Sequence, residues 1–182
     1  LVKEYPESPE NRNKLAGTLV NLALVCNALG DYAEAKRHLD EGQPHHRAAL
    51  DANAKDPSYR DFYRKHLQAR MRTCAGLDDR DGTVNAAAVY RDLGWEPARN
   101  AYDAARALAS CIAIVERNSD GSDADRRERV DFYAREAMTL LRVAMMRGFR
   151  DAGQISKDTA FAPLRGRADF KKLVADLKVG SP

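Results

Sequence analysis

Two segments of this chain repeat the same residues at the same relative positions, and this repeat is the feature that most constrains the fold. About 48 positions separate Pro9, Arg12, Leu19 and Cys26 from their counterparts Pro57, Arg60, Leu67 and Cys74. Within each segment the apolar residues are spaced three and four apart, as on one face of an α-helix. A period of this length, filled with helical patterns, is typical of proteins built from stacked pairs of helices.

The apolar spacing predicts helices along the whole chain and no strand of useful length. The expected helices span residues 9–29, 32–39, 45–54, 56–75, 83–93, 97–116, 124–147 and 158–164, followed by an amphipathic helix that contains residues 170–177. Gly42-Gln43-Pro44 is expected to bend or interrupt the second helical segment, because proline cannot donate the helical hydrogen bond.

The spacing also predicts which side chains point inward. For residues 9–29 these are Leu15, Leu19, Leu22, Ala23, Cys26 and Leu29. For residues 56–75 they are Tyr59, Phe62, Tyr63, Leu67, Met71 and Cys74, and for residues 124–147 they are Val130, Tyr133, Ala134, Ala137, Leu140, Leu141 and Ala144.

Charge and composition exclude several classes of protein. The 30 basic and 27 acidic residues give a net charge of only +3, which provides no general attraction to nucleic acid or anionic membrane. No apolar run is long enough to span a bilayer, and the first residues show no signal-peptide pattern. Because the sequence starts without a methionine, we expect it to be a piece of a longer chain.

The three cysteines, Cys26, Cys74 and Cys111, are scattered without paired spacing, which argues for buried, reduced thiols in a reducing, cytoplasmic compartment. His38, His45 and His46 lie close in sequence, but their spacing matches no zinc pattern, so we expect exposed histidines and no metal site. Glu116, Asn118, Asp120 and Gly121 resemble the start of a calcium loop. The place of its bidentate glutamate holds Arg127, so we interpret the segment as a solvated loop before a helix cap.

The first pair of helices resembles the tetratricopeptide-repeat (TPR) signature. It carries Asn21-Leu22-Ala23, then Leu29-Gly30-Asp31-Tyr32, then Glu34-Ala35 and Leu39. Small residues in such a pattern let two helices approach closely, while larger residues fill the space between successive pairs. Leu108-Ala109, together with Ala137, Leu141 and Ala144, repeats this arrangement. Two positions depart from the pattern: Gly42 stands where TPR units have alanine, and Arg70-Met71 replaces a leucine followed by a small residue.

Longer strings resemble a narrower family, the C-terminal TPR region of large bacterial serine/threonine protein kinases. These strings are residues 44–50 (PHHRAAL), 102–105 (YDAA), 147–152 (RGFRDA) and 157–173 (KDTAFAPLRGRADFKKL), and the last is the most specific. The resemblance covers essentially the whole chain. It implies a regulatory or docking arm that follows a kinase domain in a signalling protein.

The expected fold is all-α, a TPR-like right-handed superhelix of about three antiparallel helix pairs in a single domain of residues 1–182. The pairs are residues 1–54, 55–94 and 95–148, and residues 149–182 form a C-terminal cap. A repeat stack exposes the apolar face of its final helix unless something covers it. The tail supplies six large apolar side chains at helical spacing for this purpose: Phe161, Leu164, Phe170, Leu173, Val174 and Leu177.

No kinase catalytic element is present in the sequence, and no nucleophile, base and orienting partner can be nominated, so we expect no enzymatic activity and no cofactor. A basic stripe recurs every four residues at Arg60, Arg64, Gln68 and Arg72, with Lys65 beside it. Arginine offers a bidentate fork to carboxylates, which favours an acidic peptide as ligand, whereas a solvated face is the alternative.

In TPR units the first helix of each pair lines the concave groove. On this register the partner-binding residues are Asn21, Leu24, Arg64, Lys65, Gln68, Arg72, Arg106 and Ser110. The leading hypothesis is therefore a protein-interaction scaffold that binds a protein or peptide, with neither a small-molecule substrate nor membrane insertion. The alternatives are a nucleic-acid-binding helical repeat that uses the basic stripe, and a structural or self-associating arm.

Overall fold

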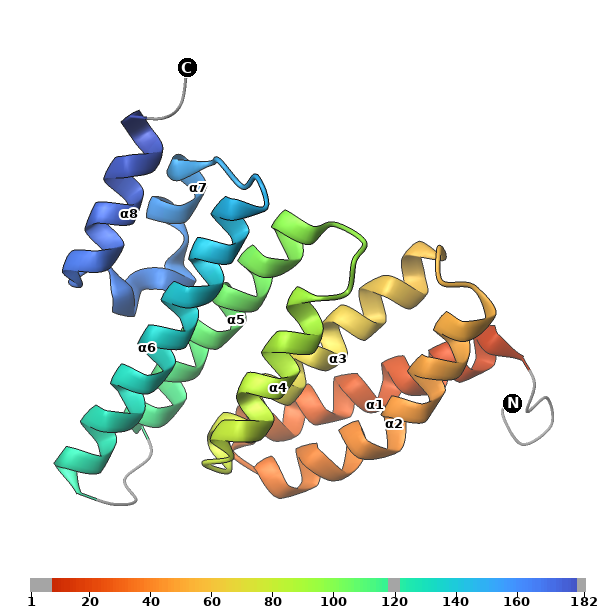
Figure 1. Cartoon of the computed structure of the whole chain (residues 1–182). Coiled ribbons are helices and arrows are strands. Elements are labelled where there is room, and N and C mark those ends of the chain that lie inside the picture. The colour runs from red at the N-terminus through yellow and green to blue at the C-terminus, as the bar shows by residue number, and fades with distance from the viewer. Residues whose placement is uncertain (1–7, 118–121, 180–182) are drawn as a thin grey trace. The chain divides into compact units, whose positions relative to one another are not determined.

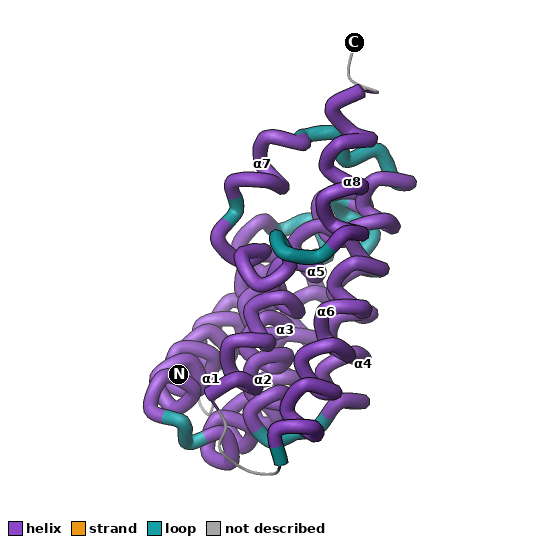
Figure 2. Tube along the Cα trace, turned by 90° about the vertical axis from the view of Figure 1, so that its left-hand side faces the viewer, coloured by secondary structure: helices purple, strands orange, loops and turns teal. Residues whose placement is uncertain are grey.

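The computed structural model describes residues 8–117 and 122–179, which form helices joined by turns and short loops (Figure 2). The helices are α1 Pro9–Leu29, α2 Tyr32–Ala52, α3 Pro57–Gly76, α4 Arg80–Arg91, α5 Pro97–Arg117, α6 Asp123–Met146, α7 Ala152–Lys157, the 3₁₀ helix η1 Thr159–Leu164, and α8 Ala168–Val179 (Figure 1). These ranges contain no strand, so the predicted all-α class is confirmed. None of their helices combines the length and apolar character needed to cross a membrane.

The chain divides into two compact units, unit 1 over residues 1–79 and unit 2 over residues 80–182. Unit 1 holds α1, α2 and α3, and unit 2 holds α4 to α8. The expected second pair, residues 55–94, therefore has α3 in unit 1 and α4 in unit 2. A single stack of three pairs stays a prediction.

Side-chain caps explain where the long helices begin. The Ser8 side chain accepts a hydrogen bond from the backbone N–H of Asn11, and Pro9 occupies a first-turn position where its missing N–H costs little. Ser122 and Asp125 form a reciprocal capping box at the start of α6. At the other end of α1, Gly30 adopts a left-handed conformation with φ of 81°, which glycine reaches without steric strain.

Unit 1 is a three-helix packing in which α1 and α3 lie side by side and run parallel. The Asn13 amide donates to the Ser58 hydroxyl at 3.2 Å, and further along the helices the Asn27 amide donates to the Ala69 carbonyl at 3.3 Å. The core between the three helices consists of Val20, Ala23, Ala35, Leu39 and Ala69, with Cys26 packed against it. Its members are mostly small, which allows the close helix approach that the sequence predicted.

The inward face predicted for α1 is only partly correct. Leu19 and Ala23 are buried, but 44% of Leu22 and 79% of Leu29 are exposed. Two neighbouring helices cover only two sides of a helix, so a broad apolar face leaves residues uncovered within unit 1.

Of the bend or interruption expected at residues 42–44, no interruption occurs, because α2 continues through Pro44. Gly42 is buried against the side chain of Leu19 on α1. Beyond Pro44, His46 packs against the rings of Tyr63 and His66 on α3, and such tertiary packing offsets the lost backbone hydrogen bond. The start of α4 also differs from expectation, since this helix begins at Arg80 rather than at Thr83.

Unit 2 is organised around α5 and α6, which lie side by side (Figure 1). Both α4 and η1 also pack against α5. The last helix, α8, contacts both α6 and α7. The apolar stripe predicted for α6 is buried, apart from the half-buried Val130. All six large apolar side chains of the tail are also buried, as the cap prediction requires: Phe161, Leu164, Phe170, Leu173, Val174 and Leu177.

Alanine substitutions at two glycines of unit 1 are expected to change the free energy of unfolding in opposite directions. A Cβ at Gly42 would lie 3.5 Å from the Cβ of Leu19, an ordinary contact, whereas a Cβ at Gly76 would lie 2.4 Å from the Tyr32 ring. We expect Gly42→Ala to raise the free energy of unfolding by about 0.5–1 kcal/mol through helix propensity. Gly76→Ala should lower it by about 1–3 kcal/mol.

Urea unfolding followed by circular dichroism measures both glycine variants. Gly42→Ala also restores the alanine that TPR units carry at this place. A destabilised Gly42→Ala variant would contradict the packing described here.

Candidate functional site

The predicted partner-binding residues fall in both units. Six of them lie in unit 1, Asn21 and Leu24 on α1 and Arg64, Lys65, Gln68 and Arg72 on α3, while Arg106 and Ser110 lie on α5 in unit 2. Only the six in unit 1 therefore belong to one compact body.

Most of these six lie on the surface of α1 and α3 that is turned away from α2. On α3, Arg70 points towards α2, because its guanidinium pairs with Asp40 at 2.7 Å. By helical spacing, Lys65, Gln68 and Arg72 lie on the side of α3 roughly opposite to Arg70, and so point away from α2. Asn21 and Leu24 lie on the corresponding side of α1, where 38% of Leu24 is exposed. These five residues therefore share one surface of unit 1, and their role in binding a partner stays a prediction.

The basic stripe itself is less continuous than its spacing suggests. The Arg60 side chain donates to the Ala54 carbonyl at 2.7 Å and so supports the turn between α2 and α3. Lys65 pairs with Asp61 at 2.8 Å, and its ammonium lies 5.4 Å from the centre of the Phe62 ring. Arg64 is half-buried, and Arg72 is exposed. The face therefore combines an exposed cation with polar and apolar side chains, rather than a row of exposed arginines.

In unit 2, Arg106 serves a contact between α5 and the tail. Its guanidinium pairs with Asp158, whose carboxylate also accepts hydrogen bonds from the Tyr102 hydroxyl at 2.6 Å and the Ala160 N–H at 3.0 Å. Burial opposes ionisation of Asp158, but these donors outweigh burial and hold its pKa below the usual value. The Ser110 hydroxyl donates to the Arg106 carbonyl at 2.9 Å. Arg106 thus anchors the cap, a role that the repeat register alone does not reveal.

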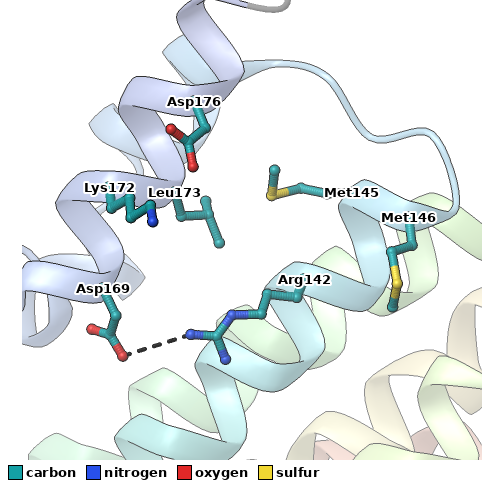
Figure 3. Close-up of a pocket in the computed structure, with 7 residues that line it drawn as sticks. All are labelled: Arg142, Met145, Met146, Asp169, Lys172, Leu173 and Asp176. Carbon is teal, nitrogen blue, oxygen red and sulfur yellow. Dashed lines mark ion pairs between the residues drawn. The ribbon is translucent and has the colours of Figure 1, made fainter.

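A groove that the sequence did not reveal lies in unit 2 between the end of α6 and α8 (Figure 3). It has a volume of about 480 Å³, and its lining consists of Arg142, Met145 and Met146 from α6 with Asp169, Lys172, Leu173 and Asp176 from α8. Met146 is 77% exposed. Methionine adapts its shape to irregular partners, so this lining suits a side chain that docks from outside.

The charged residues of this groove differ in how closely they are held by partners within the chain. Asp169 receives hydrogen bonds from Arg167 at 3.0 and 3.2 Å and from the Phe170 N–H at 3.0 Å, and the Arg167 contact is the main reason for its lowered pKa. Arg142 reaches the same carboxylate only at 3.8 Å (Figure 3). Arg142 and Lys172 therefore stand on opposite walls with most of their charge available to a ligand.

Sequence reasoning missed the groove because its lining residues, apart from Leu173, lie outside the predicted apolar stripes. Met145 and Met146 follow the last stripe residue of α6, Ala144, and Lys172 and Asp176 are charged residues that lie between the inward positions of the tail. The one sequence signal for the groove was the pair of adjacent methionines, Met145 and Met146, at the end of α6, outside the inward positions predicted for that helix.

The predicted exposure of the histidines is wrong for His46, which is fully buried and packs its ring 5.1 Å from that of His66. Among the described residues, no group of three or more histidine, cysteine and acidic side chains lies close enough to hold a metal ion. Residues 118–121 of the calcium-like segment lie outside the described residues. Cys74 and Cys111 are buried and Cys26 is half-buried, close to expectation.

Both surfaces combine exposed apolar side chains with charged ones. Comparison with family models, with curated proteins and with solved structures finds no match for this chain.

Proposed function

We propose that this chain is a protein-interaction module that binds a peptide segment of a partner protein. The observation that carries the proposal is the groove between α6 and α8, because its methionine and leucine lining is flanked by charges, as in grooves that accept amphipathic helices. The exposed face of α1 and α3 around Leu24 and Arg72 provides a second contact area on unit 1.

The arrangement within each unit supports a TPR-like right-handed superhelix as part of this proposal. In unit 1, α1 and α2 form a pair, and α3 then lies beside and parallel to α1, as the first helix of a following repeat does. In unit 2, α5 and α6 pair in the same way.

The context that we propose is a cytoplasmic docking or regulatory arm of a large bacterial serine/threonine protein kinase. Its support is the resemblance of residues 157–173 and the shorter strings to the C-terminal TPR region of that family. Catalysis would then reside in another part of the parent protein, and this chain would select the substrate or the regulator.

For the groove, charge complementarity selects a peptide that carries acidic residues beside an apolar anchor. A leucine or aromatic side chain would contact Met145, Met146 and Leu173. A glutamate one turn away would reach Arg142 or Lys172, whose charges stand on opposite walls. Asp176 and Asp169 disfavour an acidic residue placed further along α8.

A labelled amphipathic helical peptide with leucines at i, i+4 and i+7 and glutamates beside them tests this proposal by fluorescence anisotropy. We expect Arg142→Glu with Lys172→Glu to weaken binding by at least about tenfold, because attraction becomes repulsion. Lys171→Glu is the matched control, since Lys171 is an exposed neighbour outside the groove. The control should bind as the wild type does.

Three other results of these binding experiments would point to a different binding surface, a different peptide charge or a different ligand. If Arg64→Glu with Arg72→Glu abolishes binding while the groove variant retains it, the face of α1 and α3 is the site instead. Equal binding of a peptide with lysines in place of glutamates would contradict the assigned charge preference. A steeply salt-dependent shift of random duplex DNA would favour the nucleic-acid alternative.

A further inference from the structure

We propose that the exposed apolar face of α1 binds a second copy of this chain, with the two α1 helices antiparallel. This face, the α1 stripe, consists of Leu15, Leu22, Val25 and Leu29, with Thr18 between the first two. Leu22 is 44% exposed, Val25 58% and Leu29 79%. Leu15 is half-buried, and the Thr18 hydroxyl donates to the Lys14 carbonyl at 3.0 Å. Several exposed apolar side chains along one face of a helix are a feature of interaction surfaces, whereas isolated ones are ordinary.

The α1 stripe lies on the side of α1 that its neighbours leave open. Asn13 and Asn27 mark the side that contacts α3, through hydrogen bonds to Ser58 and Ala69. Leu19 marks the side against α2, where it meets Gly42. At about 100° per residue, Leu22 and Leu29 point roughly opposite to α3. An incoming helix could therefore pack here without displacing either neighbour.

The α1 stripe is also free of charge. No charged residue occurs from Leu15 to Gly30, although 31% of the chain is charged. A charged partner peptide would lose hydration against this surface and gain no counter-charge. An equally uncharged, apolar helix face suits it, and the α1 stripe of a second copy has this property.

The spacing of the stripe matches packing of one helix along another. Positions 15, 22 and 29 are seven apart, and positions 18 and 25 fall between them, which is the heptad pattern of paired helices. The stripe is about 21 Å long at 1.5 Å per residue. Such a contact lies at the small end of specific interfaces, so we expect association that depends on concentration in the micromolar range.

Charges at the two ends of the stripe select the antiparallel orientation. Lys14 lies just before the stripe and pairs with Glu10 at 2.6 Å, and Asp31 lies just after the stripe and caps α2 through the Glu34 N–H. Both side chains are exposed, so each can also meet a charge on a second copy. An antiparallel pair brings Lys14 of one copy near Asp31 of the other, at both ends. A parallel pair would oppose like charges and align the two helix dipoles unfavourably.

A consequence is that each dimer would present every peptide-binding surface twice. Two sites on one particle raise the apparent affinity for a partner that is itself dimeric or carries repeated motifs. The proposal does not depend on the peptide-binding function, because α1 self-association can be measured without any ligand.

Analytical ultracentrifugation of the 182-residue chain over a concentration series tests the association. We expect reversible dimerisation that Val25→Glu weakens at least about tenfold, because each dimer would bury two unpaired carboxylates. Val89→Glu on α4 is the matched control, since Val89 is also an exposed valine on a helix, at 39%. It should dimerise as the wild type does, and circular dichroism should show both variants folded. A chain that stays monomeric throughout overturns the proposal.

Oxidative cross-linking tests the orientation in a Cys26→Ala background. Leu22 lies midway between Lys14 and Asp31, so Leu22→Cys should form an intermolecular disulfide readily. Leu29→Cys should not, because antiparallel packing places the two copies of this position about 21 Å apart. Efficient cross-linking through position 29 but not through position 22 would overturn the antiparallel arrangement.

Discussion

Deleting every residue after Gly153 is expected to make the chain aggregate or to remove most of the stability of unit 2. The deletion uncovers the apolar face of α5 and α6 and removes seven large buried apolar side chains, Ile155 and the six of the tail; Phe161 and Leu164 among them are both 0% exposed. Each large apolar side chain contributes about 1.5–3 kcal/mol before ordering costs. Their sum is comparable with the roughly 5–15 kcal/mol that stabilises a whole domain. Size-exclusion chromatography and thermal denaturation measure the result.

Smaller changes separate a loss of capping from simple failure to fold. Phe161→Ala should lower the free energy of unfolding by about 3–5 kcal/mol, whereas Ala162→Ser, at an exposed neighbouring position, should change little. Asp158→Asn should cost about 1–3 kcal/mol, because it weakens the acceptor shared by Tyr102 and Arg106. A truncated chain that stays monomeric with an unchanged melting temperature would show that the tail is not a cap.

Lowering the pH below 6.5 is expected to reduce the free energy of unfolding of unit 1 by more than protonation of its carboxylates alone would. His46 on α2 and His66 on α3 are 0% and 1% exposed, and neither ring has a hydrogen-bond partner among the described residues. Burial is the main cause that lowers the pKa of His46 to about 4 and that of His66 to about 3, from an ordinary value of 6.5.

The direction of this effect follows from which state binds more protons. Between the folded and unfolded pKa values, the unfolded chain is protonated at both histidines while the folded chain is not. Stability is therefore complete above pH 6.5 and is lost as the pH falls towards the folded values. The loss should reach about 2 kcal/mol for each histidine at about pH 5, since one pKa unit corresponds to about 1.4 kcal/mol.

Nearby charges modify this titration without reversing it. His45 lowers the pKa of His46 further. For His66, the charges of His46 and Arg70 lower the pKa and that of Asp40 raises it. Urea unfolding at several pH values measures the loss, which His46→Phe with His66→Phe should remove while retaining stability at neutral pH. His38→Gln is the control, because His38 lies beside Glu34 at 3.3 Å near the surface. An unchanged acid dependence in the double variant would contradict the assignment.

The candidate sites divide between what the repeat register could place and what it could not. The register placed Lys65, Gln68 and Arg72 with Leu24 on one face, because helical spacing alone determines which side chains share a side. That this face binds a partner stays a prediction. It could not show that Arg106 binds Asp158, fifty-two positions away in the sequence. Nor could it show the groove beside Met145, since a groove exists only where two separate helices meet.

The sequence by itself determined the helices, since caps, apolar spacing and glycine stops are local and set where most of them begin and end. It also determined that the tail is buried, because six apolar residues at helical spacing have no other stable place in water. Tertiary structure decided which part of each apolar face is covered. It left Leu22 and Leu29 exposed on α1, buried His46 against His66, and kept α2 continuous through Pro44. These outcomes depend on which helices become neighbours, and helical periodicity carries no information about the neighbour.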